Sequence, residues 1–280
     1  MTETENSKLK TTLNYDPIKN ILGKVFNKNL FLRILFYKLL DLLLLRTWHI
    51  KKVLKKWLAD KKNINILDAG SGFGQYSYFL SSFDKSFNIL GVDVKKEQID
   101  DCNNFFKKIG KKNITFETTD LTTFQKPYSF DLILCVDVME HIEEDVKVFE
   151  NFYASLKMQG MLLISTPSDI GGSDAHDSDD ESFIGEHVRN GYNNEDIKNK
   201  LLQAGFNNIE VNYSYGKPGK LSWLLSMKYP ILLLHMSKLF LIILPFYYII
   251  TFPFSFVLNY FDVASKHKSG TGLIVKAEKL

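Results

Sequence analysis

The sequence predicts an α/β fold with a doubly wound, mostly parallel sheet of seven strands. Apolar runs of strand length alternate with helix-like segments from residue 63 onwards, and this alternation produces crossover connections between parallel strands. Acidic residues follow several of the runs, and three glycines follow the first. Ligands of such sheets bind at the carboxyl ends of the strands. The functional site is therefore expected at that edge.

The first predicted strand ends on an acid and breaks into closely spaced glycines. The segment INILDAGSGFGQYSYF places Asp68 at the carboxyl end of the strand and Gly70, Gly72 and Gly74 in the turn before a helix. Glycine tolerates positive φ and lets a ligand approach the backbone. The spacing GxGxG differs from the GxGxxG fingerprint of dinucleotide-binding turns. Taken alone, the turn indicates either a nucleotide-like cofactor site or a purely structural connection.

The next strands repeat this arrangement of apolar run and acid. They are predicted at residues 88–94, 114–120, 130–136 and 161–167. Asp93 lies 25 residues after Asp68, where a carboxylate can accept hydrogen bonds from a ribose. Asp120 ends the third run and Asp137 follows the fourth. Residues 208–216 and 271–279 are predicted as an antiparallel pair that completes the sheet.

In chain order, the segments ILDAGSGFG, GVDV, ETTD, FDLILCVDVMEHI and LKMQGMLLISTP resemble the class I S-adenosylmethionine (SAM)-dependent methyltransferases, which have a Rossmann-like sheet. The resemblance covers about residues 63–210 and the last ten residues. It implies SAM as cofactor, with the first acid and glycines at its methionine part and Asp93 at its ribose. It also implies that Asp120 and Leu121 contact the adenine, and that residues 135–137 lie beneath the sulfonium. The implied cofactor-binding residues are Asp68, Gly70, Ser71, Gly72, Asp93, Val94, Asp120, Leu121, Cys135 and Asp137.

Asp137, Glu140 and His141 have a spacing that would place three polar groups on one face of a helix. A divalent cation could use that geometry. The alternative is a helix start that serves the helix terminus or the cofactor pocket. We favour this second interpretation and predict no metal ligand.

The residues expected to face the substrate follow the fifth strand. Residues 168–182 form a polar stretch with six carboxylates, predicted to be a loop over the site. His187 is the preferred general base, because an imidazole titrates near neutrality, and His141 is the second choice. Arg189 and Tyr192 complete the predicted catalytic group. The alternative is that these side chains brace the entry to the following helix.

Residues 1–62 are predicted to be a basic amphipathic helical extension. They hold 14 Lys or Arg against 5 Asp or Glu. Large apolar residues between the charges argue against a nucleic-acid partner. A helix over residues 29–45 would gather Arg33, Lys38 and Asp41 within an arc of roughly 140°. Such a helix could lie on an anionic bilayer or pack over the cofactor as a lid.

A second extension separates the last two strands. Residues 239–258 contain no charge, which is the hydropathy of a membrane span. Both ends must return to one sheet, which argues against a single crossing, and Pro230, Pro245 and Pro253 are predicted to interrupt helices. Lys228, His235 and Lys238 argue against two full crossings. Two or three short apolar helices are expected to dip into the membrane interface, cover a lipophilic substrate or bury a homodimer contact. The predicted organisation is extension 1–62, methyltransferase core 63–220, apolar insertion 221–265 and final strand 266–280.

The sequence thus predicts a SAM-dependent methyltransferase that O-methylates a lipophilic small molecule, such as a quinone, a polyene or a lipid-like compound, at or near the membrane. Two alternatives stay open: an NAD-binding oxidoreductase and a non-catalytic membrane-associated scaffold. Cys102 and Cys135 are the only cysteines, and the polar start carries no apolar targeting segment. A reducing cytoplasm is therefore expected, with peripheral contact at the inner face of the membrane.

Overall fold

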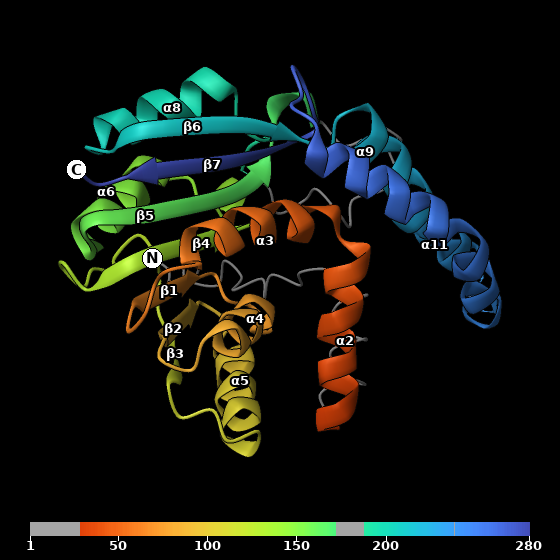
Figure 1. Ribbon diagram of the computed structural model, residues 1–280, viewed down its shortest axis with the longest axis horizontal. Helices are drawn as coiled ribbons and strands as arrows, with labels where there is room; N and C mark the ends of the chain where they lie inside the picture. The colour runs from red at the N-terminus through yellow and green to blue at the C-terminus, as the bar shows by residue number, and fades with distance from the viewer. Residues whose placement is uncertain (1–28, 172–187, 238) are drawn as a thin grey trace, which may run out of the picture.

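The computed structural model describes residues 29–171, 188–237 and 239–280. Seven strands form one sheet in the order β3-β2-β1-β4-β5-β7-β6 (Figure 1). The strands are β1 (Asn65–Ala69), β2 (Asn88–Asp93), β3 (Ile114–Thr118), β4 (Phe130–Val136), β5 (Leu156–Pro167), β6 (Asn207–Ser214) and β7 (Gly272–Glu278). Strand β7 pairs antiparallel with both β5 and β6, and the remaining pairs are parallel. The predicted fold is confirmed.

Helices cover both faces of the sheet and so create two hydrophobic cores. The helices are α2 (Leu30–Leu43), α3 (Leu45–Leu58), α4 (Gln75–Phe83), α5 (Lys96–Lys108), α6 (Asp145–Ser155), α8 (Asn194–Gln203), α9 (Lys217–Trp223), α10 (Tyr229–Met236) and α11 (Phe240–Ala264). Helices α3, α4 and α5 bury side chains against one face, while α6 and α8 bury theirs against the other. Strand side chains alternate accordingly: Ile66 joins the first core and Leu67 the second.

The described part of the basic N-terminal segment forms two helices, and α2 agrees with the helix predicted over residues 29–45. The chain is extended at Leu44, with φ −88° and ψ 109°, and this residue separates α2 from α3. Asn29 caps α2 by accepting a hydrogen bond from the backbone N–H of Phe31 at 2.8 Å. Helix α3 packs on the sheet through Ile50 and Leu54, which are fully buried. The break lets α3 follow the sheet while α2 turns across its edge (Figure 1).

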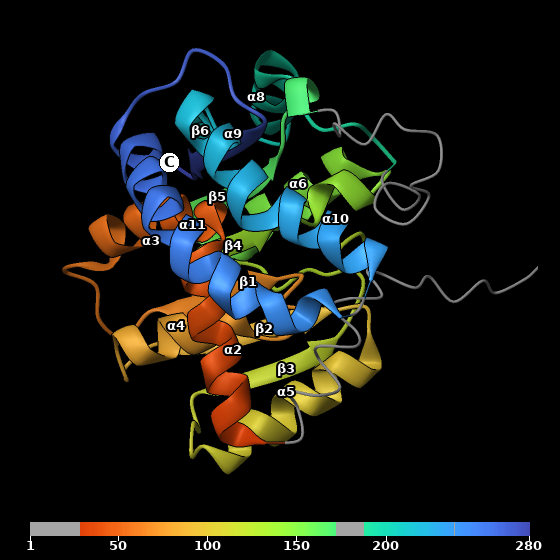
Figure 2. The ribbon, with the colours of Figure 1, turned by 90° about the vertical axis from the view of Figure 1, so that its right-hand side faces the viewer.

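The apolar insertion is a helical hairpin that projects beyond the sheet in Figure 1 and lies in front of it in Figure 2. Its first arm contains α9, a π-helical turn (Leu224–Lys228) and α10, and its second arm is α11. The prediction that prolines break the second arm is wrong, because α11 runs for 25 residues through Pro245 and Pro253. Each internal proline removes one backbone donor, at a cost of about 3 kcal/mol. Contacts with the first arm help to hold the helix, since the hydroxyls of Tyr247 and Tyr248 donate to carbonyls of the π-helical turn at 2.7 and 2.8 Å.

Candidate active site

The glycine turn after β1 is fastened to the neighbouring strand. The backbone N–H groups of Gly70 and Ser71 donate to the carbonyl of Val92 at 2.8 and 2.9 Å. Gly70 has φ +75°, and a Cβ there would lie 2.1 Å from the side chain of Val138. At Gly72, also at positive φ, a Cβ would have its nearest neighbour at 3.9 Å. The turn therefore has one position that requires glycine for packing and another that is open to a ligand.

Asp93 is positioned directly beside this turn. Its Oδ2 accepts a hydrogen bond from the backbone N–H of Gly72 at 3.0 Å, and its Oδ1 accepts one from the N–H of Lys95 at 3.0 Å. The adjacent Val94 is exposed. A carboxylate fixed in this way keeps lone pairs for further donors. Its geometry fits the ribose role that the resemblance implies.

Two buried polar side chains lie beneath the turn. Asp68 is buried, and its Oδ2 accepts a hydrogen bond from the Ser77 hydroxyl at 2.6 Å. Burial raises the pKa of Asp68 to about 6. The hydroxyl of Ser71 is buried and has no hydrogen-bond partner among the described residues. A buried carboxylate beside an orphaned hydroxyl fits the ammonium and polar groups of the methionine part of SAM.

The residues predicted at the adenine and beneath the sulfonium lie on the adjoining strand ends. Asp120 is exposed, and its Oδ1 accepts hydrogen bonds from the N–H and hydroxyl of Thr122 at 2.8 Å each. Leu121 and Cys135 are buried in the core. Burial raises the pKa of the Cys135 thiol well above its usual range, so this thiol stays neutral.

Asp137 follows β4 with φ +52° and forms an ion pair with Arg46, which projects from α3. The backbone N–H of Arg46 donates to the Tyr215 hydroxyl at 3.1 Å, so α3 also connects to the loop after β6. The next residue, Thr47, lies 3.3 Å from the hydroxyl of Tyr76. Sequence reasoning missed this polar group, because Arg46 is one of many cations in the extension and no local signal directs it inward.

The helical face predicted for Asp137, Glu140 and His141 is not formed. Only Met139–His141 adopt a helical turn, of the 3₁₀ type, and Asp137 precedes it in the left-handed region. Glu140 is buried and accepts a hydrogen bond from the Thr166 hydroxyl at 3.1 Å. Burial and the neighbouring Asp137 raise its pKa. Within the described ranges, no three His, Cys, Asp or Glu side chains are grouped to hold a metal ion.

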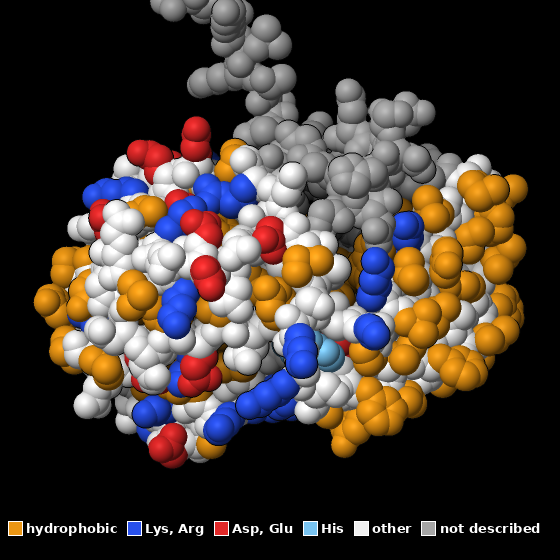
Figure 3. Space-filling model, turned by 90° about the horizontal axis from the view of Figure 1, so that it is seen from above, with side chains coloured by type: hydrophobic (Ala, Val, Ile, Leu, Met, Phe, Trp, Pro, Cys, Tyr) orange, Lys and Arg blue, Asp and Glu red, His pale blue; other side chains and the backbone are white. Residues whose placement is uncertain are grey.

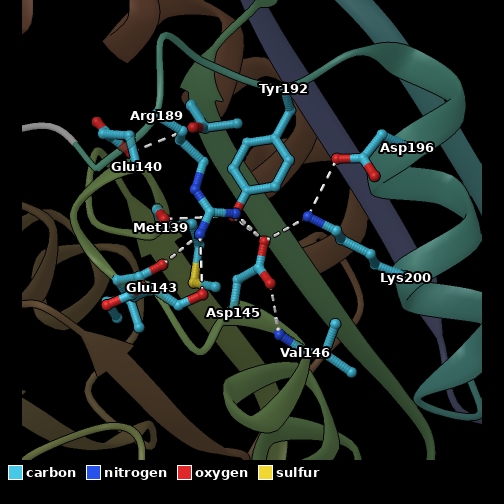
Figure 4. Close-up of polar contacts among 11 residues, drawn as sticks. Met139, Glu140, Glu143, Asp145, Val146, Arg189, Tyr192, Asp196 and Lys200 are labelled. Atoms are coloured by element: carbon cyan, nitrogen blue, oxygen red, sulfur yellow. Dashed lines mark hydrogen bonds and ion pairs between the residues drawn. The ribbon is translucent and has the colours of Figure 1, made fainter.

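Arg189 and Tyr192 meet in a cluster around Asp145 (Figure 4). The hydroxyl of buried Tyr192 donates to Asp145 Oδ2 at 2.8 Å, and Lys200 pairs with the same oxygen at 2.8 Å. Arg189 pairs with Asp145 and donates to the Ile142 carbonyl at 2.6 Å. These contacts fasten the loop after β4 to α8, which is the bracing alternative considered for this pair. Their assignment as catalytic residues stays a prediction.

The two predicted bases are placed differently by the structure. His141 is half-buried at the end of the 3₁₀ turn, next to Glu140. His187 lies outside the described residues, as do residues 172–182 of the predicted loop. Both assignments stay predictions.

A buried acid at the end of the hairpin is a further feature that the sequence did not reveal. Asp262 is fully buried and lies between His49, at 2.8 Å, and His267, at 3.1 Å. It also accepts hydrogen bonds from the backbone N–H groups of Tyr215 and Gly219 at 3.1 and 2.9 Å. Although burial favours the neutral acid, the hydrogen bond from His49 and the charges of both histidines lower its pKa. This network joins α11 to α3 and to the loop after β6.

Comparisons with known proteins agree with this geometry. A family described as methyltransferase domain matches residues 60–210. The ubiquinone biosynthesis O-methyltransferase of Rickettsia felis is 27% identical over 107 residues, which cover 38% of this chain and 43% of the relative. Phosphoethanolamine N-methyltransferase 1 of Triticum aestivum is 29% identical over 157 residues, covering 53% of this chain and 29% of the relative. The matched segments thus span less than half of these curated relatives.

Solved structures share the fold at low identity. Phosphoethanolamine N-methyltransferase 2 of Haemonchus contortus, in complex with SAM, superposes with a TM-score of 0.58 and 20% identity over 81% of this chain and 51% of that chain. A structure described as a putative sarcosine dimethylglycine methyltransferase from Galdieria sulphuraria superposes with a TM-score of 0.58 and 18% identity over 83% of this chain and 84% of that chain. The family match extends over more than half of the chain. The chain belongs to the methyltransferase domain family of SAM-dependent enzymes.

Proposed function

We propose that the protein transfers a methyl group from SAM to a hydroxyl group of a lipophilic small molecule at the cytoplasmic face of the membrane. A quinone precursor, a polyene or a lipid-like compound has the required chemistry. The observation that carries the proposal is a chain of polar contacts between the site and an exposed apolar hairpin. Asp262 of α11 accepts a hydrogen bond from the backbone N–H of Tyr215. The Tyr215 hydroxyl accepts a hydrogen bond from the backbone N–H of Arg46, and the Arg46 side chain forms an ion pair with Asp137 at the end of β4.

The hairpin has the composition of a lipid-contacting element. Helix α11 is long and apolar enough to cross a membrane, and only 6% of its most apolar window is buried. Soluble domains rarely leave such a surface uncovered. Figure 3 shows hydrophobic side chains gathered over this end of the molecule, while charges of both signs cover the opposite end. An acceptor that partitions into lipid would be concentrated beside the site.

Methyl transfer depends mainly on the alignment of the acceptor atom with the methyl group. SAM supplies an electrophilic methyl group when it is bound. The chain would hold the cofactor through the glycine turn, Asp68 and Asp93, and would shield the site with α3. Alignment of acceptor and methyl group in a dry site can remove roughly 7–11 kcal/mol of barrier. A hydroxyl acceptor must also lose its proton, and His187 or His141 would accept it.

The curated relatives support a methyltransferase but differ in acceptor. The name of the Rickettsia felis relative specifies O-methylation in ubiquinone biosynthesis, whereas that of the Triticum aestivum relative specifies N-methylation of phosphoethanolamine. The exposed hairpin favours the lipophilic acceptor over the small polar amine. The NAD-dependent alternative is disfavoured by the GxGxG spacing.

The first experiment is a calorimetric titration of the purified protein with S-adenosylhomocysteine. Micromolar binding is expected, together with its loss in Asp93→Ala. Asp100→Ala is the matched control, because Asp100 is an exposed acid of α5 paired only with Lys96 among the contacts described. Equal binding by both variants would remove Asp93 from the cofactor site, and preferential binding of NAD would overturn the proposal.

The acceptor is then tested with methyl-labelled SAM. Membrane lipid extracts, quinol precursors and phosphoethanolamine are supplied in parallel, and labelled products are separated by their partition into organic solvent. We expect label in a base-stable, organic-soluble methyl ether. Label confined to a water-soluble amine would reject the lipophilic acceptor and favour N-methylation.

The base is tested by comparing His187→Ala with His141→Ala in single-turnover reactions. The base variant should slow turnover at least about a hundredfold while leaving S-adenosylhomocysteine affinity unchanged. Unchanged turnover in both variants would show that neither histidine accepts the proton.

A further inference from the structure

Helix α2 buries a charged side chain and exposes several apolar ones. Its buried side chains are Arg33, Phe36 and Tyr37, and the Arg33 side chain is only 2% exposed. Ile34 and Leu40 pack against the same core. A second set of apolar side chains points outwards: Phe31 is 70% exposed, and Leu35, Leu39 and Leu42 are each 38% exposed. A soluble helix normally directs its apolar face to the core. The outer face of α2 therefore requires a partner that is itself apolar.

The inward face of α2 grips the cofactor turn. Nη2 of Arg33 donates to the carbonyl of Phe73 at 2.9 Å, and the hydroxyl of Tyr37 donates to the same carbonyl. Nη1 of Arg33 pairs with Asp101 of α5. One turn further along, Asp41 accepts a hydrogen bond from the side chain of Gln75 at 2.8 Å. Phe73 and Gln75 flank the last glycine of the turn, so the position of α2 and the shape of the turn are mechanically linked.

The outer face of α2 and the hairpin lie on one side of the molecule. The C-terminus marks the end of antiparallel β7, so the parallel strands end on the opposite side, where α2 and α11 stand in Figure 1. Figure 2, which views that side directly, shows both α2 and the hairpin in front of the sheet, and in Figure 1 the hairpin projects further out than α2. Exposed apolar side chains of α11 include Ile242, Phe246, Ile249 and Ile250. Two separate elements thus present apolar surface on the side where the cofactor turn lies.

The charges around this surface suit a lipid headgroup layer. Between residues 215 and 270 the sequence holds six lysines and one acid, Asp262, which is buried between two histidines. Lys217, Lys266 and Lys268 are exposed near the base of the hairpin. Cations at the border of an exposed apolar surface are typical of interfacial contact with anionic lipids.

We propose that α2 is a second membrane-contacting element, and that its contact with a lipid bilayer stabilises the glycine turn in its cofactor-binding form. The proposal rests on the proposed function and adds its regulation. Lipid and cofactor then bind cooperatively, because both favour the same arrangement of α2 and the turn. Linkage makes the effect reciprocal: lipid tightens cofactor binding by the same factor by which cofactor tightens lipid binding.

The test measures S-adenosylhomocysteine affinity of the full chain by equilibrium dialysis, with and without vesicles of phosphatidylcholine and phosphatidylglycerol. Vesicles should tighten binding about fivefold or more. Leu35→Ser combined with Leu39→Ser should keep the affinity measured without vesicles, since both side chains point away from the turn, and should lose the vesicle effect. Met158→Ser combined with Leu202→Ser is the matched control, because these exposed residues lie on other elements; it should retain the effect.

Hydrogen exchange of the backbone amides at residues 70–75 provides a readout that needs no cofactor. Vesicles should slow exchange there in the native chain and in the control, but not in the α2 variant. A chain that binds no S-adenosylhomocysteine under any condition would refute the proposed function, while this exchange would still decide the role of α2. Co-sedimentation with vesicles and no change in affinity or exchange would overturn the inference. Dissociation of a dimer by the α2 variant, again with no vesicle effect, would assign the face to a second copy of the chain.

Discussion

Asp262 in α11 accepts a hydrogen bond from the backbone N–H of Tyr215 at 3.1 Å, and this contact joins the hairpin to the loop after β6. Asp262→Ala should destabilise the protein by about 3 kcal/mol, because it leaves the partners of a buried charge unpaired. Asp262→Asn keeps the shape and one acceptor and should cost less. Urea unfolding followed by circular dichroism measures both.

The pH dependence of that loss gives a second check on Asp262. Its pKa is lowered in the folded chain, so its contribution is complete above the unfolded value near 4 and is lost as the pH falls through the folded pKa. The stability difference between native chain and Asp262→Asn should therefore shrink in acid. A difference that is constant from neutral to acid pH would contradict a role for the charge.

Alanine variants at Gly70 and Gly110 separate the cost of packing in the glycine turn from the cost of a positive φ. Both have nearly the same φ, +75° and +74°, but a Cβ meets Val138 at Gly70 and nothing within 4 Å at Gly110. Each alanine variant should lose about 1 kcal/mol from the backbone. Gly70→Ala should lose about 1–3 kcal/mol more from overpacking, together with S-adenosylhomocysteine binding.

Val138→Ala supplies the internal control for this pair. Added to Gly70→Ala, it should restore part of the stability and of the cofactor affinity, because it removes the atoms that collide. Thermal unfolding and calorimetric titration of the double variant report both quantities. Equal behaviour of Gly70→Ala and Gly110→Ala would show that the collision is relieved at no cost.

The raised pKa of Asp68 predicts how cofactor affinity varies with pH. Burial raises its pKa to about 6, so the carboxyl is neutral in acid and gains the charge that attracts an ammonium group as the pH rises. S-adenosylhomocysteine binding should tighten by up to roughly tenfold between about pH 5 and pH 7 and then level off. Asp68→Asn should bind more weakly and lose this dependence. A retained slope in the variant would assign the titration to another group.

The variant Tyr192→Phe distinguishes a bracing role of this side chain from a catalytic role. Its hydroxyl donates to Asp145 and lies 3.2 Å from the Met139 carbonyl, so Tyr192→Phe should cost about 1 kcal/mol of stability. With a bracing role, kcat should fall less than about tenfold and KM should change little. A loss of kcat of about a hundredfold or more with unchanged stability would instead support the catalytic assignment.

The features that the sequence predicted correctly are those encoded locally. The strand positions along the chain, the glycine turn and the acid at the end of β2 follow from apolar runs and spacing, and each lies within a few residues of the predicted position. Neighbouring residues determine strand and turn formation, so the pattern is readable without knowledge of the rest of the chain. The first strand and the turn after it needed no tertiary information.

The features that escaped prediction depend on partners distant in sequence. Arg33 reads as a solvent-facing charge, but Asp101 and the Phe73 carbonyl draw it inwards. Arg46 meets Asp137 across 91 positions of sequence, and Asp262 reads as the polar end of an apolar helix. Pro245 and Pro253 were wrongly predicted to interrupt α11, because contacts between the two arms support a helix that local propensity disfavours.

The way in which the hairpin is attached has a consequence for how this enzyme can diverge. Ser214 and Gly272, the residues at the two ends of the connection, are register partners in the β6–β7 pair. The sheet therefore closes in the same register whether a tight turn or a long excursion joins the two strands. A change in the length or side chains of the hairpin that keeps Asp262 and its partners therefore leaves the register of the cofactor strands unchanged. Under the proposed function, this segment can change the choice of acceptor and the contact with the membrane while the glycine turn and its strands are kept.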